Sequence, residues 1–510
     1  MYLSKSKFLK GMQCPKMLWL EKHKQEVLSQ SDQKTFRSGQ EVGKLACDLF
    51  TGGSEVVFDQ ENMAQMIIHT QKLLDEGVNV IYEATFEYEG IFVMVDILEI
   101  KRSGGKIDNV VLNEVKSSTS AFKDKAKKKV KEVYLWDLAL QYYVLKGLGF
   151  SVSGAYLICL NNTYIRKGAL DLEQLFLKND LLKPIEDFQS KIPEYLTNIG
   201  KVLESTQEPD QDIGVHCENP YVCDAKNYCW EQRGIIGNHH IFAIAGFNLD
   251  KKVRVYKAGR VFFKDLNQED LQTLNAKQAL QVTCALNDKP NIDKEAIQGF
   301  LSQLKYPLYH LDFETTQPAI PLFENTKPYA KIPFQYSIHV DFGNGKLEHQ
   351  EFLADCGTDG RLALAQQLTN DIPKEACVLV YNASFEKSVL QELANLFATQ
   401  HPKLANNLLQ IRDNIVDLME PFKQGHYYTP QMNGSYSIKA VLPALVPEFE
   451  NAYQSLELVH NGEEAMEAYE RMPYLPKEEQ EKYKRALLEY CKLDTLAMVE
   501  VLEVLKRVAE

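Results

Sequence analysis

The chain has 510 residues, of which 45% are hydrophobic and 25% charged, and its formal net charge is −13. This composition is that of a globular protein, and the length predicts two to four domains. No run of about 18 apolar residues occurs and the N-terminus lacks an apolar leader segment, so we expect a cytoplasmic protein without a membrane span. The acidic balance excludes a surface that binds nucleic acid everywhere, but it allows a local basic track.

Residues 1–232 predict a mixed α/β domain. A helix is expected after Cys14-Pro15, and two strands are expected in residues 78–100 with a turn at Glu89-Gly90. The segment VVLNEVKSS predicts another strand, residues 121–147 predict a lysine-rich stretch followed by a helix, and SGAYLICLN predicts a further strand. This order fits a central sheet with helices packed against it.

A first set of chemically active residues lies in these strands. Asp96 lies in one strand, and Glu114 and Lys116 lie two residues apart in the next, so the latter two share a face. Asp96 and Glu114 are suited to hold a divalent cation while Lys116 orients water or stabilises the phosphate. Gln141 follows beside two tyrosines in the expected helix. The alternative is that these are solvent-facing residues on edge strands, because the ExK pattern alone is common.

Four cysteines flank this set. Cys14 lies near the start of the chain, and Cys217, Cys223 and Cys229 follow at equal spacing about two hundred residues later. Four thiolates hold either a tetrahedral zinc ion or a cubane iron–sulfur cluster. The spacing differs from the CxxC pairs of zinc sites, so we expect a 4Fe-4S cluster, with zinc and unrelated buried thiols as the alternatives. The other six cysteines lie in mostly apolar segments and predict reduced, buried thiols.

The acidic motif, the glutamine and the four cysteines together resemble the RecB-like PD-(D/E)xK nucleases that carry an iron–sulfur cluster, such as the CRISPR-associated RecB-like exonucleases and the AddB-type helicase–nuclease subunits. The resemblance implies a restriction-endonuclease-like fold over residues 1–232, whose two ends the cluster holds together. It implies an active site made of Asp96, Glu114, Lys116 and Gln141, with the first two as metal ligands.

One departure concerns the metal. The RecB-like nucleases often have a metal-binding histidine in an early helix. The matching segment here, SGQEVGKLA, has Gly43 at that position. One ligand is then either absent or supplied by another acid such as Glu83.

Basic residues follow the first acidic motif. Six lysines crowd one short run, Lys123, Lys125, Lys127, Lys128, Lys129 and Lys131. Such a run is either a solvated helix face or, beside a nuclease site, a track for a phosphate backbone. Further along, Tyr164 with Arg166 and Lys167 suits base stacking combined with backbone pairing.

Residues 233–300 predict a small helical connector, and residues 301–510 predict a second α/β domain. Its strands are expected near residues 308–313, 334–340 and 377–382. Its helices are expected near residues 361–370, 385–398, 438–445 and 478–508.

A second acidic set lies in this domain. Asp312 and Glu314 lie two residues apart in the apolar segment HLDFETT, again on one face of a strand. Buried paired carboxylates repel each other unless cations or protons intervene. Glu386 follows at a strand-to-helix junction, and Tyr490 and Asp494 lie four residues apart on one face of the last helix.

These three segments, in this order, resemble the DEDD exonucleases of the ribonuclease H-like fold, in the subgroup marked by YxxxD. The resemblance implies two-metal phosphodiester hydrolysis with Mg²⁺ or Mn²⁺ held by Asp312, Glu314 and Asp494. It also implies that Tyr490 orients or deprotonates the attacking water.

The second motif of that family ends in Asp, whereas Glu386 stands here, one methylene longer. The carboxylate is kept, and Asp417 is a spare candidate for the same role. Ser437 and Lys439 in the segment GSYSIKAVLPAL are placed either to touch a phosphate or simply to begin a helix.

The pairing of these two domains resembles a family of bacterial proteins, over nearly the whole chain except about 233–300. It implies a metal-dependent nuclease with two sites that acts on DNA ends or single strands, with the C-terminal half as a 3′–5′ exonuclease. In one alternative, only the C-terminal half cuts, with RNA as a further substrate, and the first domain binds. In another, the chain is a non-catalytic nucleic-acid-binding or assembly module of a repair or defence complex. The sequence does not tell DNA from RNA.

Overall fold

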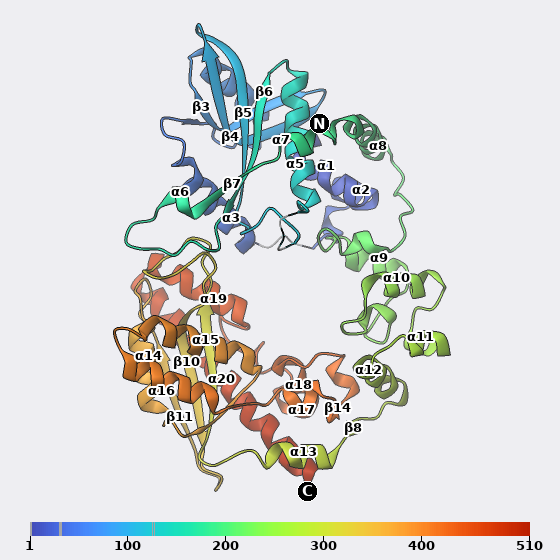
Figure 1. The fold of residues 1–510 in the computed structure, drawn as a ribbon. Helices are drawn as coiled ribbons and strands as arrows, with labels where there is room; N and C mark the ends of the chain where they lie inside the picture. The colour runs from blue at the N-terminus through green and yellow to red at the C-terminus, as the bar shows by residue number, and fades with distance from the viewer. Residues whose placement is uncertain (1–2, 30–32, 125, 127) are drawn as a thin grey trace. The chain divides into compact units, whose positions relative to one another are not determined.

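The computed structural model describes residues 3–29, 33–124, 126 and 128–510, with side chains from residue 37 onward in the second range. The chain forms two compact units (Figure 1). Unit 1 consists of Met1–Gly234 and Pro318–Tyr329, and unit 2 consists of Ile235–Gln317 and Ala330–Glu510. Each unit contains a β-sheet with helices packed against it, so the predicted α/β class is confirmed. In the described residues no helix is both long and apolar enough to cross a membrane.

Unit 1 is built on a seven-stranded sheet in the order β2-β3-β4-β5-β6-β7, with β1 paired to β4. Its strands are β1 (Leu3–Ser4), β2 (Ser54–Glu55), β3 (Val80–Tyr88), β4 (Ile91–Ser103), β5 (Lys106–Lys116), β6 (Val152–Leu160) and β7 (Phe176–Asp180). Strands β3, β4 and β5 are antiparallel, and the predicted turn at Glu89-Gly90 joins the first two, with both residues at positive φ. Strands β5 and β6 are parallel, and the chain between them forms helix α5 (Glu132–Gly147), which packs on the sheet.

The helices at the start of the chain differ from the prediction. Helix α1 (Lys5–Gln13) already begins before Cys14, because the Ser4 hydroxyl accepts a hydrogen bond from the Lys7 backbone N–H at the helix N-terminus. Cys14 is extended, and Pro15 opens helix α2 (Pro15–His23). The other α-helices of unit 1 are α3 (Gln33–Cys47), α4 (Met63–Asp75), α6 (Leu172–Leu175), α7 (Leu182–Glu186), α8 (Ile192–Glu204) and α9 (Lys226–Gln232).

Unit 2 contains a five-stranded sheet in the order β11-β10-β9-β12-β13. Its strands are β9 (Leu308–Thr316), β10 (Ile332–Asp341), β11 (Leu347–Leu353), β12 (Cys377–Val380) and β13 (Ile415–Asp417). Strand β10 is antiparallel to both β9 and β11, whereas β12 is parallel to both β9 and β13. The three strands predicted for this half match β9, β10 and β12.

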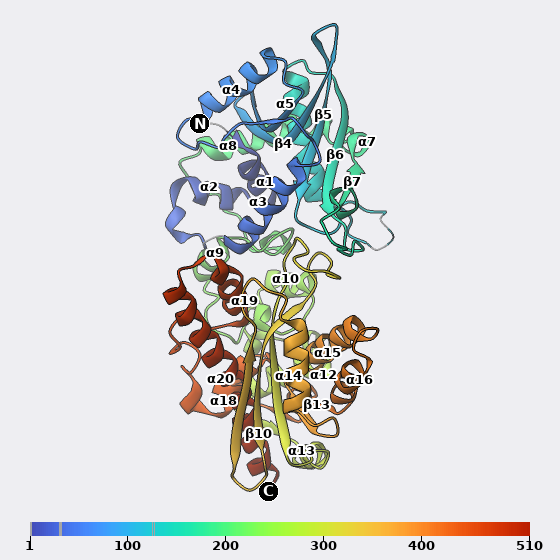
Figure 2. The ribbon, with the colours of Figure 1, turned by 90° about the vertical axis from the view of Figure 1, so that its left-hand side faces the viewer.

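Helices cover both faces of this sheet (Figure 2). On one face lie α14 (Arg361–Asp371), α15 (Ala383–Phe397) and α16 (Pro402–Asp413), and on the other lie α18 (Ile438–Leu445), α19 (Gly462–Arg471) and the long α20 (Lys477–Ala509). The four predicted helices of this half match α14, α15, α18 and α20, whereas α16 and α19 were not predicted. A short helix, α17 (Glu420–Lys423), and strand β14 (Tyr427–Tyr428) precede α18.

Strand β9 is central, and its side chains alternate between two cores. Residues at odd positions pack with α14, α15 and α16, namely Tyr309, Leu311 and Phe313. Leu308 packs in the core that contains α20. Because strand residues alternate, Asp312 and Glu314 lie on the face of the sheet that α20 covers.

The segment predicted as a connector is helical, but it belongs to unit 2. It forms α10 (Leu249–Lys257), α11 (Gln268–Gln272), α12 (Ala276–Asn287) and α13 (Lys294–Leu301), with strand β8 (Asn291–Ile292) paired to β14. Cys284, Ile297 and Phe300 lie in the same hydrophobic core as α20. The segment therefore shares a core with residues 301–510, which sequence patterns within the segment alone do not reveal.

Residues 318–329, between β9 and β10, are part of unit 1. Ala319 is buried there, in a core that includes Val115 of β5 and Ile158 of β6. The guanidinium of Arg166 donates to the carbonyl oxygens of Pro321 at 3.0 Å and Leu322 at 2.7 Å. These contacts complete the core of unit 1 with a segment far along the chain.

We expect Arg166→Ala to loosen residues 318–329 and to lower the free energy of unfolding by about 1–3 kcal/mol, because two carbonyl oxygens lose their donor. Hydrogen–deuterium exchange of the peptide 318–329, together with the melting temperature, measures both effects. Lys167→Ala is the matched control, because this exposed side chain bonds to the Asn325 side chain of the same segment and its loss is expected to change stability by less than about 0.5 kcal/mol. Unchanged exchange in Arg166→Ala would contradict the anchoring role.

Candidate active sites and the cysteine group

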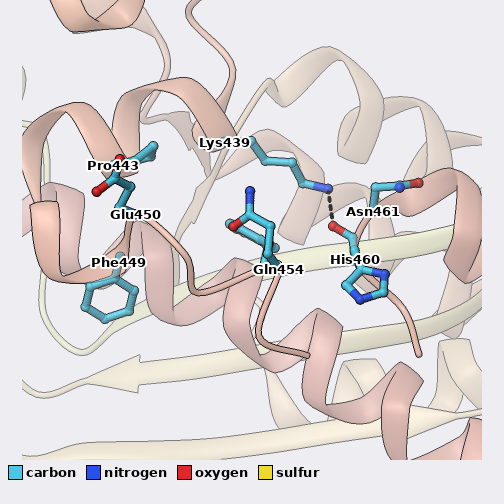
Figure 3. A pocket seen from close by; sticks show the side chains of 8 residues that line it. Lys439, Pro443, Phe449, Glu450, Gln454, His460 and Asn461 are labelled. Carbon is cyan, nitrogen blue, oxygen red and sulfur yellow. Dashed lines mark hydrogen bonds between the residues drawn. The ribbon is translucent and has the colours of Figure 1, made fainter. Parts of the chain in front are cut away.

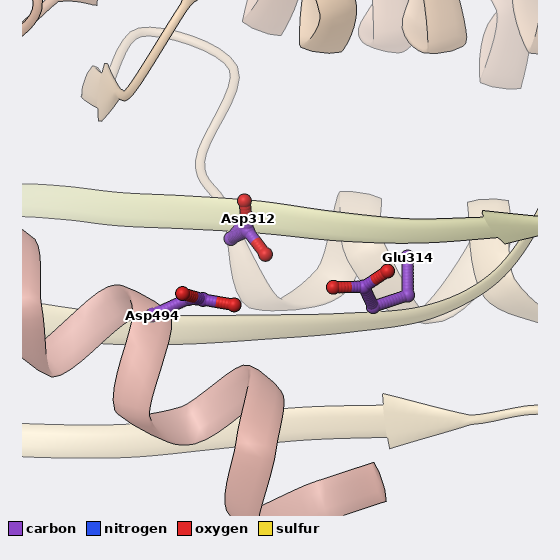
Figure 4. A group of neighbouring side chains, drawn as sticks. All are labelled: Asp312, Glu314 and Asp494. Atoms are coloured by element: carbon purple, nitrogen blue, oxygen red, sulfur yellow. The ribbon is translucent and has the colours of Figure 1, made fainter. Parts of the chain in front are cut away.

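The acids predicted for the second half converge in unit 2 (Figure 4). Asp312 and Glu314 come from β9, and Asp494 comes from α20 on the same face. Their ligand oxygens lie within 4.8 Å of one another, the only such group of three or more Asp, Glu, His or Cys in the described part of the chain. Burial and the neighbouring carboxylates raise the pKa of Asp312 and of Glu314 well above the usual range. The group therefore requires either protons or cations at neutral pH.

Two tyrosines and a lysine border these acids. The Tyr453 hydroxyl donates to Asp494 Oδ1 at 2.6 Å, and Lys439 Nζ donates to the Tyr490 hydroxyl at 3.0 Å. The Lys439 ammonium also lies 5.0 Å from the centroid of the Tyr453 ring and 4.9 Å from that of Tyr490. Burial and the surrounding carboxylates raise the pKa of Tyr490, so its phenol is neutral at physiological pH. Sequence reasoning missed Tyr453, which lies in no recognisable motif.

The fourth acid of this site is Glu386. It lies in the first turn of α15, is 1% exposed, and its Oε2 has no hydrogen-bond partner among the described residues. Burial, followed by the charge of Asp312, raises its pKa well above the usual range. Asp417, in contrast, accepts hydrogen bonds from the backbone N–H groups of Asn382 and Ala383, each at 3.0 Å. Asp417 therefore caps the N-terminus of α15, and Glu386 is the acid of the two whose carboxylate keeps an oxygen without a partner among the described residues.

A cavity of about 250 Å³ lies beside this site (Figure 3). Its lining includes Lys439 and Tyr453, which border the acids, together with Phe449, His460 and Asn461. The ammonium of Lys439 points to the carbonyl oxygen of His460, 3.4 Å away. The cavity offers aromatic and polar surface next to the acids.

The residues predicted for the first site also meet, in unit 1. Gln141 Nε2 donates to Glu114 Oε2 at 2.7 Å, and Lys116 Nζ lies 2.7 Å from Glu114 Oε1. Asp96 lies beside them, but its Oδ2 accepts a hydrogen bond of 2.6 Å from the Val115 backbone N–H. Burial, then the charge of Glu114, raises the pKa of Asp96 to about 8. The structure thus brings three of the four predicted residues into direct contact and leaves Asp96 bonded to the backbone.

Sequence reasoning missed two members of this site. Asp137 contacts both Lys116 and Gln141, and Lys5 Nζ lies 2.8 Å from Glu114 Oε1 and 2.8 Å from Asp137 Oδ1. Asp137 precedes Gln141 by four residues on α5, so helical spacing was a usable signal. For Lys5 no such signal exists, because it reaches the site through the pairing of β1 with β4.

At Gly43, where the related nucleases often have a metal-binding histidine, there is room for a side chain. A Cβ atom added to Gly43 in α3 would meet no atom within 4 Å. Burial, and then the charge of Glu114, raise the pKa of Glu83 to about 7, so Glu83 lies close enough to the site to respond to its charges.

The lysine run forms a loop rather than a helix face. A bridge between Phe122 and Val130 closes it, and the carboxylate of Asp124 accepts hydrogen bonds from backbone N–H groups inside it. Lys125 and Lys127 lie outside the described residues. Of the others, three are exposed: Lys123, Lys128 and Lys129.

The aromatic residue of the second basic group does not match its predicted role. Tyr164 is buried, and its hydroxyl accepts a hydrogen bond of 3.0 Å from the Asp171 backbone N–H. Arg166 and Lys167 bond to residues 318–329. The prediction that Tyr164 stacks on bases is therefore wrong, because its ring is buried, and contact of Arg166 and Lys167 with a nucleic-acid backbone stays a prediction.

The four cysteines lie in one region of unit 1. Cys14, Cys223 and Cys229 share a small core, and the backbone N–H of Cys223 bonds to the carbonyl oxygen of Cys217 at 2.9 Å. Burial, and then the neighbouring cysteines among other groups, raises the pKa of Cys223 to about 12. No three of the four described sulfurs lie within 4.8 Å of one another. Tetrahedral zinc needs sulfurs about 3.8 Å apart, given a Zn–S distance of about 2.3 Å, so the thiols are not arranged around a single ion.

Comparison with known proteins finds a match to one family model and to several relatives. Residues 309–437 match a family described as a domain of unknown function, DUF2779, and this range contains Asp312, Glu314 and Glu386. An uncharacterized protein of Mycoplasma pneumoniae is 25% identical over 396 residues, which cover 69% of this chain and 59% of the relative. One of Ureaplasma parvum is 25% identical over 310 residues, 56% and 43% of the two chains. One of Mycoplasma genitalium is 29% identical over 216 residues, 39% and 32%.

The chain thus spans about a third to three fifths of the length of these curated relatives. No solved structure gives a significant match.

Proposed function

We propose that the protein is a metal-dependent nuclease whose catalytic site is in unit 2, with a ribonuclease H-like fold of the DEDD type. The observation that carries this proposal is the convergence of Asp312, Glu314 and Asp494, whose oxygens lie within 4.8 Å of one another. Burial and mutual repulsion raise the pKa values of Asp312 and Glu314, and bound cations would relieve this repulsion. Carboxylate oxygens are also the ligands that Mg²⁺ and Mn²⁺ prefer.

The residues present fit such ions. Asp312, Glu314 and Asp494 would hold them, and the unpartnered Oε2 of Glu386 is available as a fourth ligand or as an acceptor for bound water. When bound, the ions activate water and stabilise the leaving 3′-oxygen of a phosphodiester.

The surrounding side chains have defined tasks in this proposal. Tyr490 lies four residues before Asp494 on α20, so its hydroxyl is available to orient or deprotonate the attacking water. Lys439 fixes the Tyr490 hydroxyl at 3.0 Å and brings a positive charge beside the acids, suited to a phosphate. The adjoining cavity provides aromatic and polar surface for part of the substrate.

For unit 1 we propose a restriction-endonuclease-like fold of the PD-(D/E)xK type that binds nucleic acid. The placement of Glu114 and Lys116 at the end of β5, next to Gln141 of α5, supports the fold. The exposed lysines of the loop 122–130 support contact with a phosphate backbone.

We also propose that Cys14, Cys217, Cys223 and Cys229 hold a 4Fe-4S cluster. Cys14, Cys217 and Cys223 are buried, Cys229 is half-buried, and all four lie in one region of unit 1, which supports four thiolate ligands. The cluster would close the loop of about two hundred residues between Cys14 and Cys217.

The test is a degradation assay on end-labelled single-stranded DNA, duplex DNA and RNA with Mg²⁺, Mn²⁺ or a chelator. We expect metal-dependent shortening from the 3′ end by the wild type and by Lys116→Ala, and none by Asp494→Asn. Asp413→Asn is the matched control, because this acid is exposed on α16 and pairs with Arg412.

Loss of activity in Lys116→Ala with activity kept in Asp494→Asn would move the nuclease to unit 1. Binding of DNA or RNA without degradation under any metal would favour the alternative of a non-catalytic binding module.

A further inference from the structure

The acids of the unit 1 site have their oxygens occupied by this chain's own donors. Glu114 Oε1 lies 2.8 Å from Lys5 Nζ and 2.7 Å from Lys116 Nζ, and its Oε2 accepts from Gln141 at 2.7 Å. Asp137 Oδ1 lies 2.8 Å from Lys5 Nζ and accepts from Gln141 at 3.1 Å, and its Oδ2 lies 2.7 Å from Lys116 Nζ. Each of these four oxygens therefore already has at least one hydrogen-bond donor.

Within the hydrogen-bonded group itself the charges are balanced, and Asp96 and Glu83 lie beside it with raised pKa values. Two ammonium groups, of Lys5 and Lys116, face two buried carboxylates, of Glu114 and Asp137. Asp96, the other predicted ligand, bonds through Oδ2 to the Val115 backbone N–H. A divalent ion bound to Glu114 would have to displace an ammonium group from oxygens that already have donors, so Glu114 and Asp137 do not fit it. Unit 2 differs, because the Lys439 ammonium bonds to the Tyr490 hydroxyl and the His460 carbonyl oxygen and not to a carboxylate.

The fold holds Lys5 in this position. The Leu3 backbone N–H bonds to the Gly90 carbonyl oxygen at 2.8 Å, and β1 pairs with the start of β4. Ser4 then caps α1, and Phe8 on the same helix is fully buried with its ring 6.3 Å from that of Trp136 on α5. Strand pairing, a helix cap and core packing thus all orient the helix that carries Lys5.

We propose that the ammonium of Lys5 takes the place of a divalent cation in unit 1, so that this site holds no catalytic metal and ties α1, β5 and α5 together by ion pairs. Unit 1 then contacts nucleic acid without cutting it. This inference does not depend on whether unit 2 is a nuclease, because it concerns only whether Glu114 binds an ion.

Mn²⁺ binding, counted by electron paramagnetic resonance on the full-length protein, tests it. We expect the single variant Glu114→Gln to bind the same number of ions as the wild type. Lys5→Met should add one ion, which the double variant Lys5→Met with Glu114→Gln loses again. Lys7→Met, two residues along the same helix, is the matched control and should add none.

Loss of a bound ion from the wild type on Glu114→Gln would overturn the proposal, and so would equal ion counts in a folded Lys5→Met variant and the wild type. Asp494→Asn separates the two units in the same assay, because any ion of unit 2 depends on Asp494 and not on Glu114. If unit 2 binds no ion, the proposed function fails while the Glu114-dependent count still decides this inference. If Lys5→Met does not fold, Glu114→Gln alone decides it.

Discussion

Asp312→Asn should abolish hydrolysis and, at the same time, stabilise the metal-free protein. Loss of one preorganised charged group costs about 10²–10³ in turnover, and Asp312 is a proposed metal ligand, so we expect a loss of about a thousandfold or more. Asp312 is also crowded by Asp494 and Glu314, and burial and this repulsion raise its pKa well above the usual range. Because the amide of asparagine carries no charge, this repulsion is lost in the variant, and we expect the metal-free variant to melt at a higher temperature than the wild type.

The free energy of unfolding of the metal-free protein should depend on pH in a direction that the raised pKa of Asp312 fixes. The folded pKa of Asp312 is raised above the value of about 3.9 in an unfolded chain, so between these values the folded protein binds more protons. The free energy of unfolding therefore falls as pH rises from about 4 through the raised pKa, and this fall should be shallower in Asp312→Asn. Buried His310, whose pKa burial lowers to about 3, destabilises the fold as pH falls below about 6.5. It does so equally in both proteins, so their difference reports Asp312 together with Glu314 and Glu386, whose pKa values the Asp312 charge raises.

Thermal unfolding of both proteins at several pH values, with chelator and with Mn²⁺, measures these effects. Mn²⁺ should raise the melting temperature of the wild type more than that of the variant. Asp341→Asn is the matched control. The buried carboxylate of Asp341 lies 3.6 Å from the Lys506 ammonium, so the variant loses an ion pair and should be less stable than the wild type. A metal-free Asp312→Asn protein that melts below the wild type would contradict the repulsion.

The proposed 4Fe-4S cluster should make the protein brown, with an absorbance at about 400 nm. Cys223→Ala should remove this colour and destabilise unit 1. A cross-link that closes a loop of more than a hundred residues is worth about 3–5 kcal/mol, and a cluster held by Cys14 and Cys217 closes such a loop. We expect a loss of this order in the free energy of unfolding of unit 1, measured by chemical denaturation under anaerobic conditions alongside iron and sulfide content.

Cys159→Ala is the control for this substitution. Cys159 is fully buried in the core of the same unit, outside the four-cysteine group, so its loss should create a small cavity while leaving colour and iron content unchanged. A colourless wild-type protein with stoichiometric zinc would contradict the cluster, as would unchanged iron content in Cys223→Ala.

Much of the unit 2 site could be predicted because it depends on local periodicity. Alternation along β9 places Asp312 and Glu314 on one face, and the i, i+4 spacing of α20 places Tyr490 with Asp494. Both features follow from the geometry of one element and need no knowledge of its neighbours. The apolar residues around Asp312 and Glu314 also predicted burial, which the structure bears out for Glu314, whereas Asp312 is half-buried.

Other members of the sites could not be predicted, because they arrive from distant elements. Tyr453 reaches Asp494 across 41 residues of chain, and Lys5 reaches Glu114 across 109. The choice between Glu386 and Asp417 depended on which carboxylate the backbone of α15 occupies. Neither helical nor strand periodicity carries information about such contacts.

The sequence by itself determined the α/β class, the strands and helices that carry the acids, and the face of each element on which these acids lie, because 2.0- and 3.6-residue periodicities are local. Only the tertiary structure decided which charges meet. It brought Lys5 to Glu114 by pairing β1 with β4, and it built residues 318–329 into the core of unit 1. The physical reason is that long-range contacts are chosen by the packing and hydrogen bonding of the whole unit, which no single segment encodes.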